Sequence, residues 1–335
     1  MALTIALLPY AVATPCAHAA QAGGGACERG CLLEMASRYA QALVAHEPGR
    51  LPVAGDVKFT ENLVPLKYGE QGLWKTVDGR RDYNIYAADV STGNVVWIGI
   101  VKENDRPVMM AARLKVVGHR VTELETLVGR SGLSAAATVR APRPDFSRPI
   151  PPAERTSRAR LIAIADSNWD AMQHGDGHLA PYAVDCERYD NGMQTSHGRS
   201  PGARGPSGAG ATASADDRSC FGQMNSSRFN NGNTVAPRRI WAVDPQYGLV
   251  VGLFTPNVPG NVRTIKLRHG KALQVPASEL VPFTIEQVEM FRVVKGQISQ
   301  VEVVLGPRVP YGMRSPFDMV TKWQQRRPSQ EDEHP

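Results

Sequence analysis

Two matching strings of polar residues contain groups that could carry acid–base chemistry. One string ends in Glu61 and Asn62, and the other ends in Asp190 and Asn191. A carboxylate in a pocket beside polar groups can act as a general base, but a carboxylate next to Asn at a strand end is also typical of turns and caps. Side chains close to these carboxylates that could contact a ligand are Arg188, Tyr189, Asn191 and Gln194 in the second string, and Asn62, Trp74 and Tyr86 in or after the first.

Other kinds of catalytic site have less support in the sequence. His174 and His178 flank two glycines at the end of an expected helix, so they share no fixed helical face and we interpret them as structural. His46 falls at the matching end of another helix, where a cation suits the helix dipole. The sequence has no Gly-x-Ser-x-Gly elbow, and its glycine-rich stretch lacks the flanking strand and helix of a phosphate loop. We therefore expect neither a bound metal nor a cofactor.

The cysteines indicate an oxidising compartment. Cys16 falls in an apolar N-terminal stretch, which leaves Cys27, Cys31, Cys186 and Cys220 as an even set. We prefer the pairs Cys27–Cys31 and Cys186–Cys220, because a Cys-x3-Cys bridge can close at a frayed helix start. Zinc is the competing interpretation, and it is weakened because no His stands at a ligand-like spacing from either pair.

The N-terminus has the pattern of an export signal. Residues 3–13 are apolar and lead to Ala17-His18-Ala19, a small-x-small pattern that suits signal peptidase. We interpret residues 1–20 as a signal peptide that lacks a basic start, and a buried N-terminal helix is the alternative. No later segment is long and apolar enough to span a membrane. The mature chain is therefore expected to be secreted or periplasmic.

The bulk properties predict two globular cores. A length of 335 residues exceeds what one small core usually holds. The apolar fraction of 42% is ordinary for a globular protein. The formal charge of +6 comes from scattered basic residues rather than from a basic stripe interleaved with aromatics. No nucleic-acid partner is therefore expected.

Each half of the chain begins with the pattern of an amphipathic helix. Apolar residues recur at helical spacing in residues 32–46 and again in residues 161–174. Both helices run into a glycine-containing stop, followed by a short apolar step and an acidic turn into a strand. The residues on the apolar faces are Leu33, Ala36, Ala40, Leu43 and Val44 in the first helix, and Ile162, Ala165, Trp169 and Met172 in the second. This repetition indicates two diverged copies of one unit.

The last strands of the two halves also match. Residues 114–128 align without a gap with residues 291–305, and both segments read as two strands joined by a tight glycine-containing turn. Glu125 and Glu302 occupy the same place in this alignment, and we interpret them as solvated or paired sheet residues. The ends of the two copies therefore predict the same hairpin.

The middle of the first copy predicts an antiparallel meander. Strands are expected at residues 83–89, 95–102 and 107–117, separated by turn-forming residues. Residues 95–101 are apolar on both faces, which predicts a sheet that is covered on both sides. A sheet that curls around a helix would leave a hollow at its open end.

These patterns divide the chain into five segments. Residues 1–20 form the signal peptide, 27–130 the first domain, 131–152 an extended linker, 153–313 the second domain with loop insertions, and 314–335 a disordered tail. The insertions are 198–217, which is rich in Gly, Ser and Arg, and 256–282.

The order of helix, acidic strand start, curved antiparallel sheet and final glycine hairpin resembles the nuclear transport factor 2-like, or SnoaL-like, cone fold. Four strings, at residues 59–62, 73–74, 190–195 and 309–313, resemble a family of secreted fungal and bacterial proteins described as a domain of unknown function. The likeness runs from about residue 27 to residue 313 and departs in the insertion after Gln194. It implies an α+β fold of two tandem cone-shaped domains, each a helix packed in a curved antiparallel sheet.

The resemblance also implies a range of functions. Catalytic cones use a pocket carboxylate to abstract an activated C–H proton, which makes Asp190 the first candidate base and Glu61 the second. The leading hypothesis is a cofactor-independent lyase or isomerase that acts on a small aromatic or polycyclic molecule. The alternative is a secreted ligand-binding or interaction protein whose two cones pack as an internal pseudo-dimer, because fold does not settle function. A periplasmic scaffold is less favoured, and assembly into a homodimer is left open.

Overall fold

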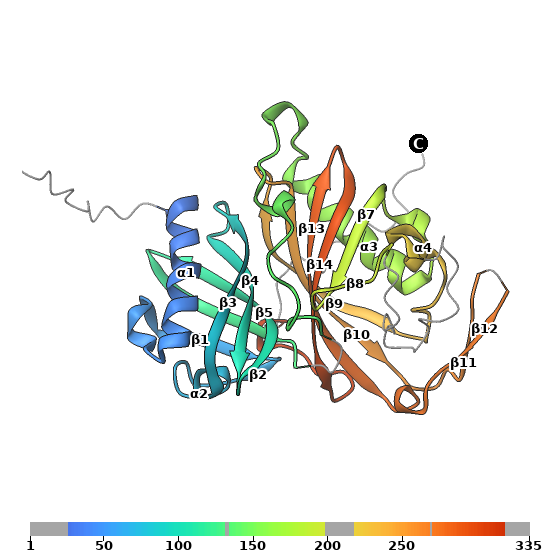
Figure 1. The fold of residues 1–335 in the computed structure, drawn as a ribbon, viewed down its shortest axis with the longest axis horizontal. Helices are drawn as coiled ribbons and strands as arrows, with labels where there is room; N and C mark the ends of the chain where they lie inside the picture. The colour runs from blue at the N-terminus through green and yellow to red at the C-terminus, as the bar shows by residue number, and fades with distance from the viewer. Residues whose placement is uncertain (1–25, 131–133, 198–217, 269, 319–335) are drawn as a thin grey trace, which may run out of the picture.

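A helix opens each half of the chain, as the spacing of apolar residues predicts (Figure 1). The computed structural model describes residues 26–130, 134–197, 218–268 and 270–318. In the first domain the elements are α1 (Arg29–Ala45), β1 (Val53–Glu61), β2 (Val64–Pro65), α2 (Leu73–Thr76), β3 (Val77–Asp89), β4 (Asn94–Glu103), β5 (Arg106–Val117) and β6 (Arg120–Val128).

The second domain repeats this order with additions. Its main elements are α3 (Arg158–His174), β7 (Tyr182–Asp190), β8 (Met193–Gln194), α4 (Cys220–Asn225), β9 (Thr234–Asp244), β10 (Leu249–Val258), β13 (Phe283–Val294) and β14 (Gln297–Val309). The later of the two predicted insertions contains a hairpin of β11 (Thr264–Lys266) and β12 (Ala272–Gln274). Short 3-10 turns are η1 (Pro48–Arg50), η2 (Pro144–Ser147), η3 (Pro152–Glu154), η4 (Gly177–Leu179), η6 (Ala277–Glu279) and η7 (Pro316–Asp318).

The two main sheets have the same strand order. The first runs β2-β1-β6-β5-β4-β3, and the second runs β8-β7-β14-β13-β10-β9. In each sheet the first long strand pairs in parallel with the last strand, and the other pairs are antiparallel. The predicted fold class, two tandem α+β domains with a helix packed in a curved sheet, is therefore confirmed.

The helices pack through the faces that the sequence predicts. The buried positions of α1 include Ala36 and Leu43, and those of α3 include Ala165 and Met172. α1 ends where His46 adopts the left-handed backbone conformation, and α3 ends at Gly175 in the same conformation. This shared end fixes the register between the helices, so that a residue of α1 corresponds to the residue 129 positions later in α3.

A tryptophan ring fills the matching part of the interior in both cones, but a strand supplies it in one cone and the helix supplies it in the other. Trp97 of β4 pairs in register with Ala112, and at the matching place in the second sheet Gly252 of β10 pairs with Glu289. The second domain instead fills this space from its helix with Trp169, whose ring lies against the backbone of Gly252. Both interiors thus hold a buried indole, supplied by the strand in one copy and by the helix in the other.

We expect Gly252→Ala to destabilise the protein by about 2–3 kcal/mol, because overpacking of a filled core has this cost. A Cβ at position 252 would lie 2.3 Å from the Trp169 ring and 3.0 Å from the carbonyl oxygen of Arg239. Gly55→Ala is the control, since a Cβ there meets nothing within 4 Å. Urea unfolding of the two variants tests this, and equal midpoints would contradict the proposed packing.

The outer faces of the two sheets pack against each other (Figure 1). Strand β4 is apolar on both faces for this reason. Val95, Trp97 and Val101 face the core under α1. Val96, Ile98 and Ile100 join the interface between the domains. The interface cluster also contains Leu253, Val288 and Met290 of the second domain. The expectation that this sheet is covered on both sides is therefore confirmed.

Reciprocal ion pairs connect the two domains. Arg29 at the start of α1 pairs with Asp244, and the matching Arg158 at the start of α3 pairs with Asp89 at 2.7 Å. Each carboxylate also accepts a backbone N–H from the edge strand of the other domain, at 3.1 Å in both cases. Contacts that are exchanged in this way define an isologous interface in symmetric dimers. The single chain thus has the internal arrangement of a dimer.

The predicted linker and the start of the predicted tail are packed segments. The described part of the linker buries Ala136, Phe146 and Ile150. At the other end of the chain, the Ser315 hydroxyl donates a hydrogen bond to Glu125, and Asp318 pairs with Arg239. Residues 314–318 therefore belong to the folded part. The predicted signal peptide, the insertion 198–217 and residues 319–335 lie outside the described residues.

Two disulfides join the cysteines that the sequence pairs. Cys27 is bonded to Cys31 at the start of α1, and Cys186 of β7 is bonded to Cys220 of α4. The second bridge holds α4 against the first long strand of its sheet. In the described part of the chain, no helix has the length and apolar character needed to cross a membrane.

Candidate functional site

A chain of charged side chains runs into the interior of the second cone. Asp190 at the end of β7 lies 2.9 Å from the Arg188 guanidinium, which lies 2.7 Å from Glu289 of β13. Arg188 and Asp190 share one face of the strand because side chains two residues apart point the same way. The side chain of Asp190 is 18% exposed, whereas those of Arg188 and Glu289 are 3% and 0% exposed. Asp190 is therefore the member of this charged network that a small molecule can reach.

Helix α3 supplies the inner end of this network. Glu289 accepts hydrogen bonds from the Asn168 amide at 3.1 Å and from the Trp169 indole at 2.8 Å. The Tyr182 hydroxyl in turn donates to the Asn168 side chain at 2.8 Å. Burial raises the pKa of Glu289, and the neighbouring Arg188 opposes this rise. The carboxyl is thus buried, and Arg188 is its cationic partner.

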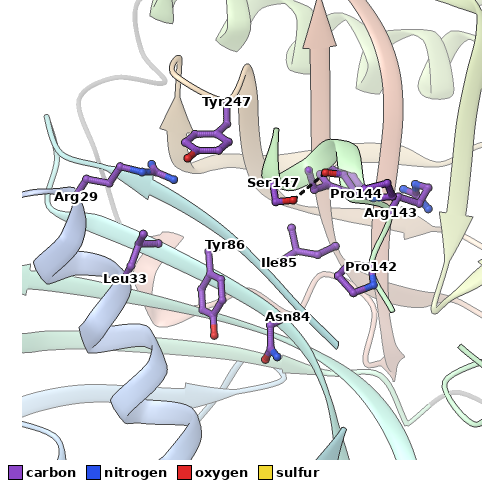
Figure 2. A pocket seen from close by; sticks show the side chains of 11 residues that line it. Arg29, Leu33, Asn84, Ile85, Tyr86, Pro142, Arg143, Pro144, Ser147 and Tyr247 are labelled. Carbon is purple, nitrogen blue, oxygen red and sulfur yellow. Dashed lines mark hydrogen bonds between the residues drawn. The ribbon is translucent and has the colours of Figure 1, made fainter. Parts of the chain in front are cut away.

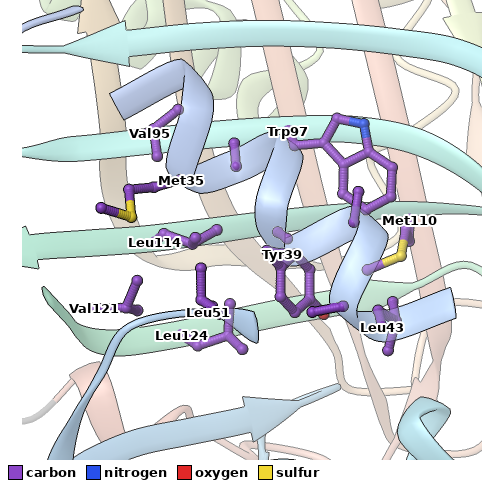
Figure 3. Close-up of a cluster of buried hydrophobic side chains, with 14 of the residues drawn as sticks. Met35, Tyr39, Leu43, Leu51, Val95, Trp97, Met110, Leu114, Val121 and Leu124 are labelled. Carbon is purple, nitrogen blue, oxygen red and sulfur yellow. The ribbon is translucent and has the colours of Figure 1, made fainter. Parts of the chain in front are cut away.

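The same positions in the first cone are occupied by uncharged side chains. Register in the sheets and in the helices matches Arg188 to Phe59, Glu289 to Ala112 and Asn168 to Tyr39. Figure 3 shows that Tyr39 lies among Trp97, Met110 and Leu43, between α1 and the sheet. The first cone therefore folds around an interior without the charged network.

Glu61, the second candidate base, has a structural place in the first cone. Its carboxylate pairs with Arg130 at 2.7 Å and accepts the backbone N–H of Leu73 at 2.8 Å. Arg130 also pairs with Glu103 at the end of β4. The carboxylate thus ties the start of α2 to the end of the sheet.

The two candidate asparagines have the same role in their domains. The Asn62 amide bonds to both the N–H and the C=O of Val128, and the Asn191 amide bonds to both groups of Leu305. Each residue adopts a left-handed backbone conformation at the end of its strand. Both amides therefore join the first long strand of a sheet to its last strand.

The structure separates the other ligand-contacting candidates. Tyr189 lies on the opposite face of β7 from Arg188, with the Arg143 guanidinium 3.8 Å from its ring centre. Gln194 pairs with Tyr189 in the short β7–β8 hairpin and is partly exposed near the mouth of the second cone. Trp74 is buried in the first core against Tyr68, and Tyr86 lines a cavity between the domains.

Three histidines, His46, His119 and His178, contact a carbonyl, a sulfur and a carboxylate rather than one another. His178 lies 2.9 Å from Asp176, and His46 contacts the carbonyl of Trp74 at 2.7 Å. His119, which the sequence spacing did not bring to attention, places Nδ1 3.4 Å from the Cys31 sulfur. These three groups, Cys27, Cys31 and His119, are close enough to hold a metal ion in principle. The sulfurs are joined in a disulfide, and so they are not the thiolates that zinc requires.

Sequence reasoning missed the inner half of the network. Glu289, Asn168 and Tyr182 were not among the candidates, because they lie far from Asp190 in the sequence. A signal was present: the gapless match between the two last hairpins places Glu289 opposite the apolar Ala112, and Asn168 stands on the apolar face of its helix. Polar residues at positions that the other copy fills with apolar groups would have identified the site.

A cavity of about 200 Å³ lies between the domains (Figure 2). It is bounded by the start of α1, the edge strand β3, the linker around η2, and the turn between β9 and β10. The lining residues are Arg29, Leu33, Asn84, Ile85, Tyr86, Pro142, Arg143, Pro144, Phe146, Ser147 and Tyr247. This cavity is separate from the charged network, which lies on the concave side of the second sheet.

Comparison with protein families finds one match, in the second half of the chain. A family model described as Domain of unknown function (DUF8021) matches residues 154–305, which is the second domain. Comparison of the sequence with curated proteins finds no match.

Three solved structures share limited similarity with the chain. An NTF2-like protein of unknown function from Cytophaga hutchinsonii is 10% identical, with a TM-score of 0.24, and the match covers 29% of this chain and 88% of that one. A de novo designed protein with a curved β-sheet is 14% identical, with a TM-score of 0.25, over 31% and 88% of the two chains. AclR, a hydroxylase candidate from Streptomyces galilaeus, is 15% identical, with a TM-score of 0.27, over 45% and 81%.

Proposed function

We propose that the second domain is a cofactor-independent lyase or isomerase site in which Asp190 is the base. The observation that supports this most directly is the buried pair of Arg188 and Glu289 beside Asp190 in one cone, at positions where the other cone has Phe59 and Ala112. The substrate class that we propose is a small aromatic or polycyclic molecule with a C–H bond next to a carbonyl.

Comparison of the two copies shows which residues the fold requires, because both copies form the same sheet and helix. A buried ion pair is often no more stabilising than apolar residues of similar volume. The first copy builds the same sheet and helix around Phe59, Ala112 and Tyr39. The buried Trp169 indole explains a hydrogen-bond acceptor at position 289, but the fold does not require a charged pair there, and a catalytic role supplies a reason for it.

The geometry supports a simple proton transfer. The Asp190 carboxylate would take the proton from the activated carbon, and the electron pair left behind would move into the adjacent carbonyl to form an enolate. The Arg188 guanidinium beside Asp190 supplies a positive charge next to the developing anion. Return of the proton to another carbon completes an isomerisation, and loss of a leaving group from the enolate completes an elimination.

We expect Asp190→Asn to lower turnover at least about 100-fold, the usual minimum contribution of a general base. The test is untargeted metabolite profiling with the purified protein, followed by rate measurement on whichever compound is consumed. Asp185→Asn is the matched control, because this exposed aspartate precedes Asp190 on the same strand. Equal turnover by the wild type and Asp190→Asn would remove Asp190 as the base.

A second candidate function is ligand binding without catalysis. It is favoured by the Trp97 and Trp169 rings, which fill the two cone interiors, and by the dimer-like packing of the domains. In that case a compound would bind to the wild type and to Asp190→Asn with similar affinity and would be recovered unchanged from both.

We further infer that the protein works outside the cytoplasm. The cysteines at positions 27, 31, 186 and 220 are all joined in disulfides, which persist in oxidising compartments. The apolar stretch at residues 1–20 supports the same inference as a signal peptide.

A further inference from the structure

The cavity between the domains has two aromatic walls. Tyr247, in the turn between β9 and β10, and Tyr86 of β3 both line it (Figure 2). Leu33, Ile85 and Pro142 add apolar surface. Neither tyrosine hydroxyl has a hydrogen-bond partner among residues 26–130, 134–197, 218–268 and 270–318. The cavity therefore combines flat apolar walls with two groups that are ready to form hydrogen bonds.

The duplication shows that Tyr247 is not needed for the turn it occupies. The backbone N–H of Tyr247 bonds to the carbonyl of Asp244, and at the matching turn of the first domain Thr92 bonds to Asp89 in the same way. A threonine thus satisfies the same backbone geometry. The aromatic ring at position 247 packs against the interface between the domains and the Arg29 guanidinium, and it also lines this cavity.

The positive charge of Arg29, which lines the cavity, is already neutralised by an ion pair. Arg29 lies with its guanidinium 4.2 Å from the centre of the Tyr247 ring, and it pairs with Asp244. An anionic ligand would therefore compete with a buried carboxylate for this charge. A neutral ligand keeps the ion pair that joins the two domains, and an aromatic ring can stack on the Arg29 guanidinium that lies over Tyr247.

The volume sets the size of the ligand. An engineered cavity of about 150 Å³ lined by apolar side chains binds benzene, and this cavity is slightly larger at about 200 Å³. One six-membered ring with one or two small substituents fits such a space. A polar substituent would meet the hydroxyl of Tyr86 or that of Tyr247.

We propose that this cavity is a binding site for a neutral, hydroxylated single aromatic ring. The site is formed by both domains and the linker, and it is distinct from the Asp190 site in the second cone. Because the ligand would contact α1, β3 and the β9–β10 turn together, its binding also stabilises the packing of the two domains.

The experiment is a titration of the ¹⁵N-labelled full chain with catechol, followed by amide chemical shifts, with cyclohexanol as a ring of similar size that is not flat. Catechol is expected to saturate with a dissociation constant of roughly millimolar, as suits a ligand of this size. The shifts should centre on the turn around Tyr247 and on β3 near Tyr86. Cyclohexanol should bind at least about tenfold more weakly.

Two variants and one control make the assignment specific. Tyr247→Thr introduces the residue that the first domain has at this turn, and it should weaken catechol binding at least about tenfold. Leu33→Phe fills the cavity and should abolish binding even if Tyr247→Thr perturbs the turn. Tyr311→Thr changes an exposed tyrosine elsewhere and should leave binding unchanged.

Three results would overturn this proposal. They are an absence of saturable catechol binding, equal binding of catechol and cyclohexanol, and shifts that centre on the residues around Asp190 in place of those around Tyr247. The last result would overturn only the proposed ring site, because the role of Asp190 as the base is tested by measuring turnover.

Discussion

Glu302→Gln is expected to raise the free energy of unfolding by ~3 kcal/mol at pH 8. Glu302 is fully buried between the sheets and pairs with Arg143 at 3.1 Å. Burial raises its pKa from 4.5 to about 7, and the nearby Arg143 and Tyr83 oppose this rise. The folded protein thus holds a proton that the unfolded chain loses, so wild-type stability falls as pH rises from about 4.5 to about 7. A glutamine side chain imitates the protonated acid and removes this loss.

The matching substitution in the first domain should have the opposite effect. Glu125 lies 2.9 Å from Arg239 and 3.3 Å from Arg113. Burial acts to raise the pKa of Glu125, but these two guanidinium groups outweigh it and hold the pKa below its usual value. Its charge stabilises the folded state above the unfolded pKa. Glu125→Gln should therefore destabilise the protein at neutral pH by about 3–5 kcal/mol, the usual cost of breaking a buried pair.

Urea unfolding of the wild type and both variants at pH 4.5, 6 and 8 tests these two expectations together. The difference between Glu302→Gln and the wild type should grow with pH, whereas Glu125→Gln should be less stable than the wild type at pH 6 and 8. Effects of the same sign at pH 8 would show that folding does not shift the pKa values of the two carboxyls in opposite directions.

Arg188→Met is expected to destabilise the second domain by about 3–5 kcal/mol. The guanidinium is 3% exposed and lies between Asp190 and Glu289, so its loss leaves the fully buried Glu289 without a cationic partner. The double variant Arg188→Met/Glu289→Gln should recover most of this loss. The glutamine side chain in this variant would be neutral and would still offer an oxygen to the Trp169 indole, which donates to Glu289 at 2.8 Å in the wild type.

A double-mutant cycle measured by urea unfolding checks this expectation. Glu289→Gln completes the cycle. The coupling free energy between positions 188 and 289 should stabilise the wild-type pair. Additive effects of the two substitutions would indicate that the charges do not interact, in conflict with their separation of 2.7 Å.

Much of the fold could be predicted because the chain repeats local patterns. The helix spacing, the last hairpin and the doubly apolar strand β4 each depend on short-range periodicity, which a single sequence contains. The reciprocal pairs of Arg29 with Asp244 and Arg158 with Asp89 could not be predicted, because they join residues that are far apart in the sequence. These two ion pairs become evident only when the two sheets are packed together through their outer faces.

The candidate site was predicted in part for the same reason. Asp190 and Arg188 were found because they are neighbours on one strand, but alternation along that strand also places Tyr189 on the other face. Glu289 comes from a different strand and Asn168 from the helix, so their approach to Arg188 depends on the tertiary fold. Glu125 and Glu302 were expected to be solvated or paired; both are paired, and their partners include residues of the other domain or the linker.

The central claim is that the charged interior of the second cone serves chemistry rather than the fold. The most direct test is to measure cooperative unfolding and turnover together on Arg188→Met/Glu289→Gln. We predict a cooperatively folded protein, close to the wild type in stability, that has lost turnover. Unfolding of this variant, or turnover at the wild-type rate, would contradict the claim.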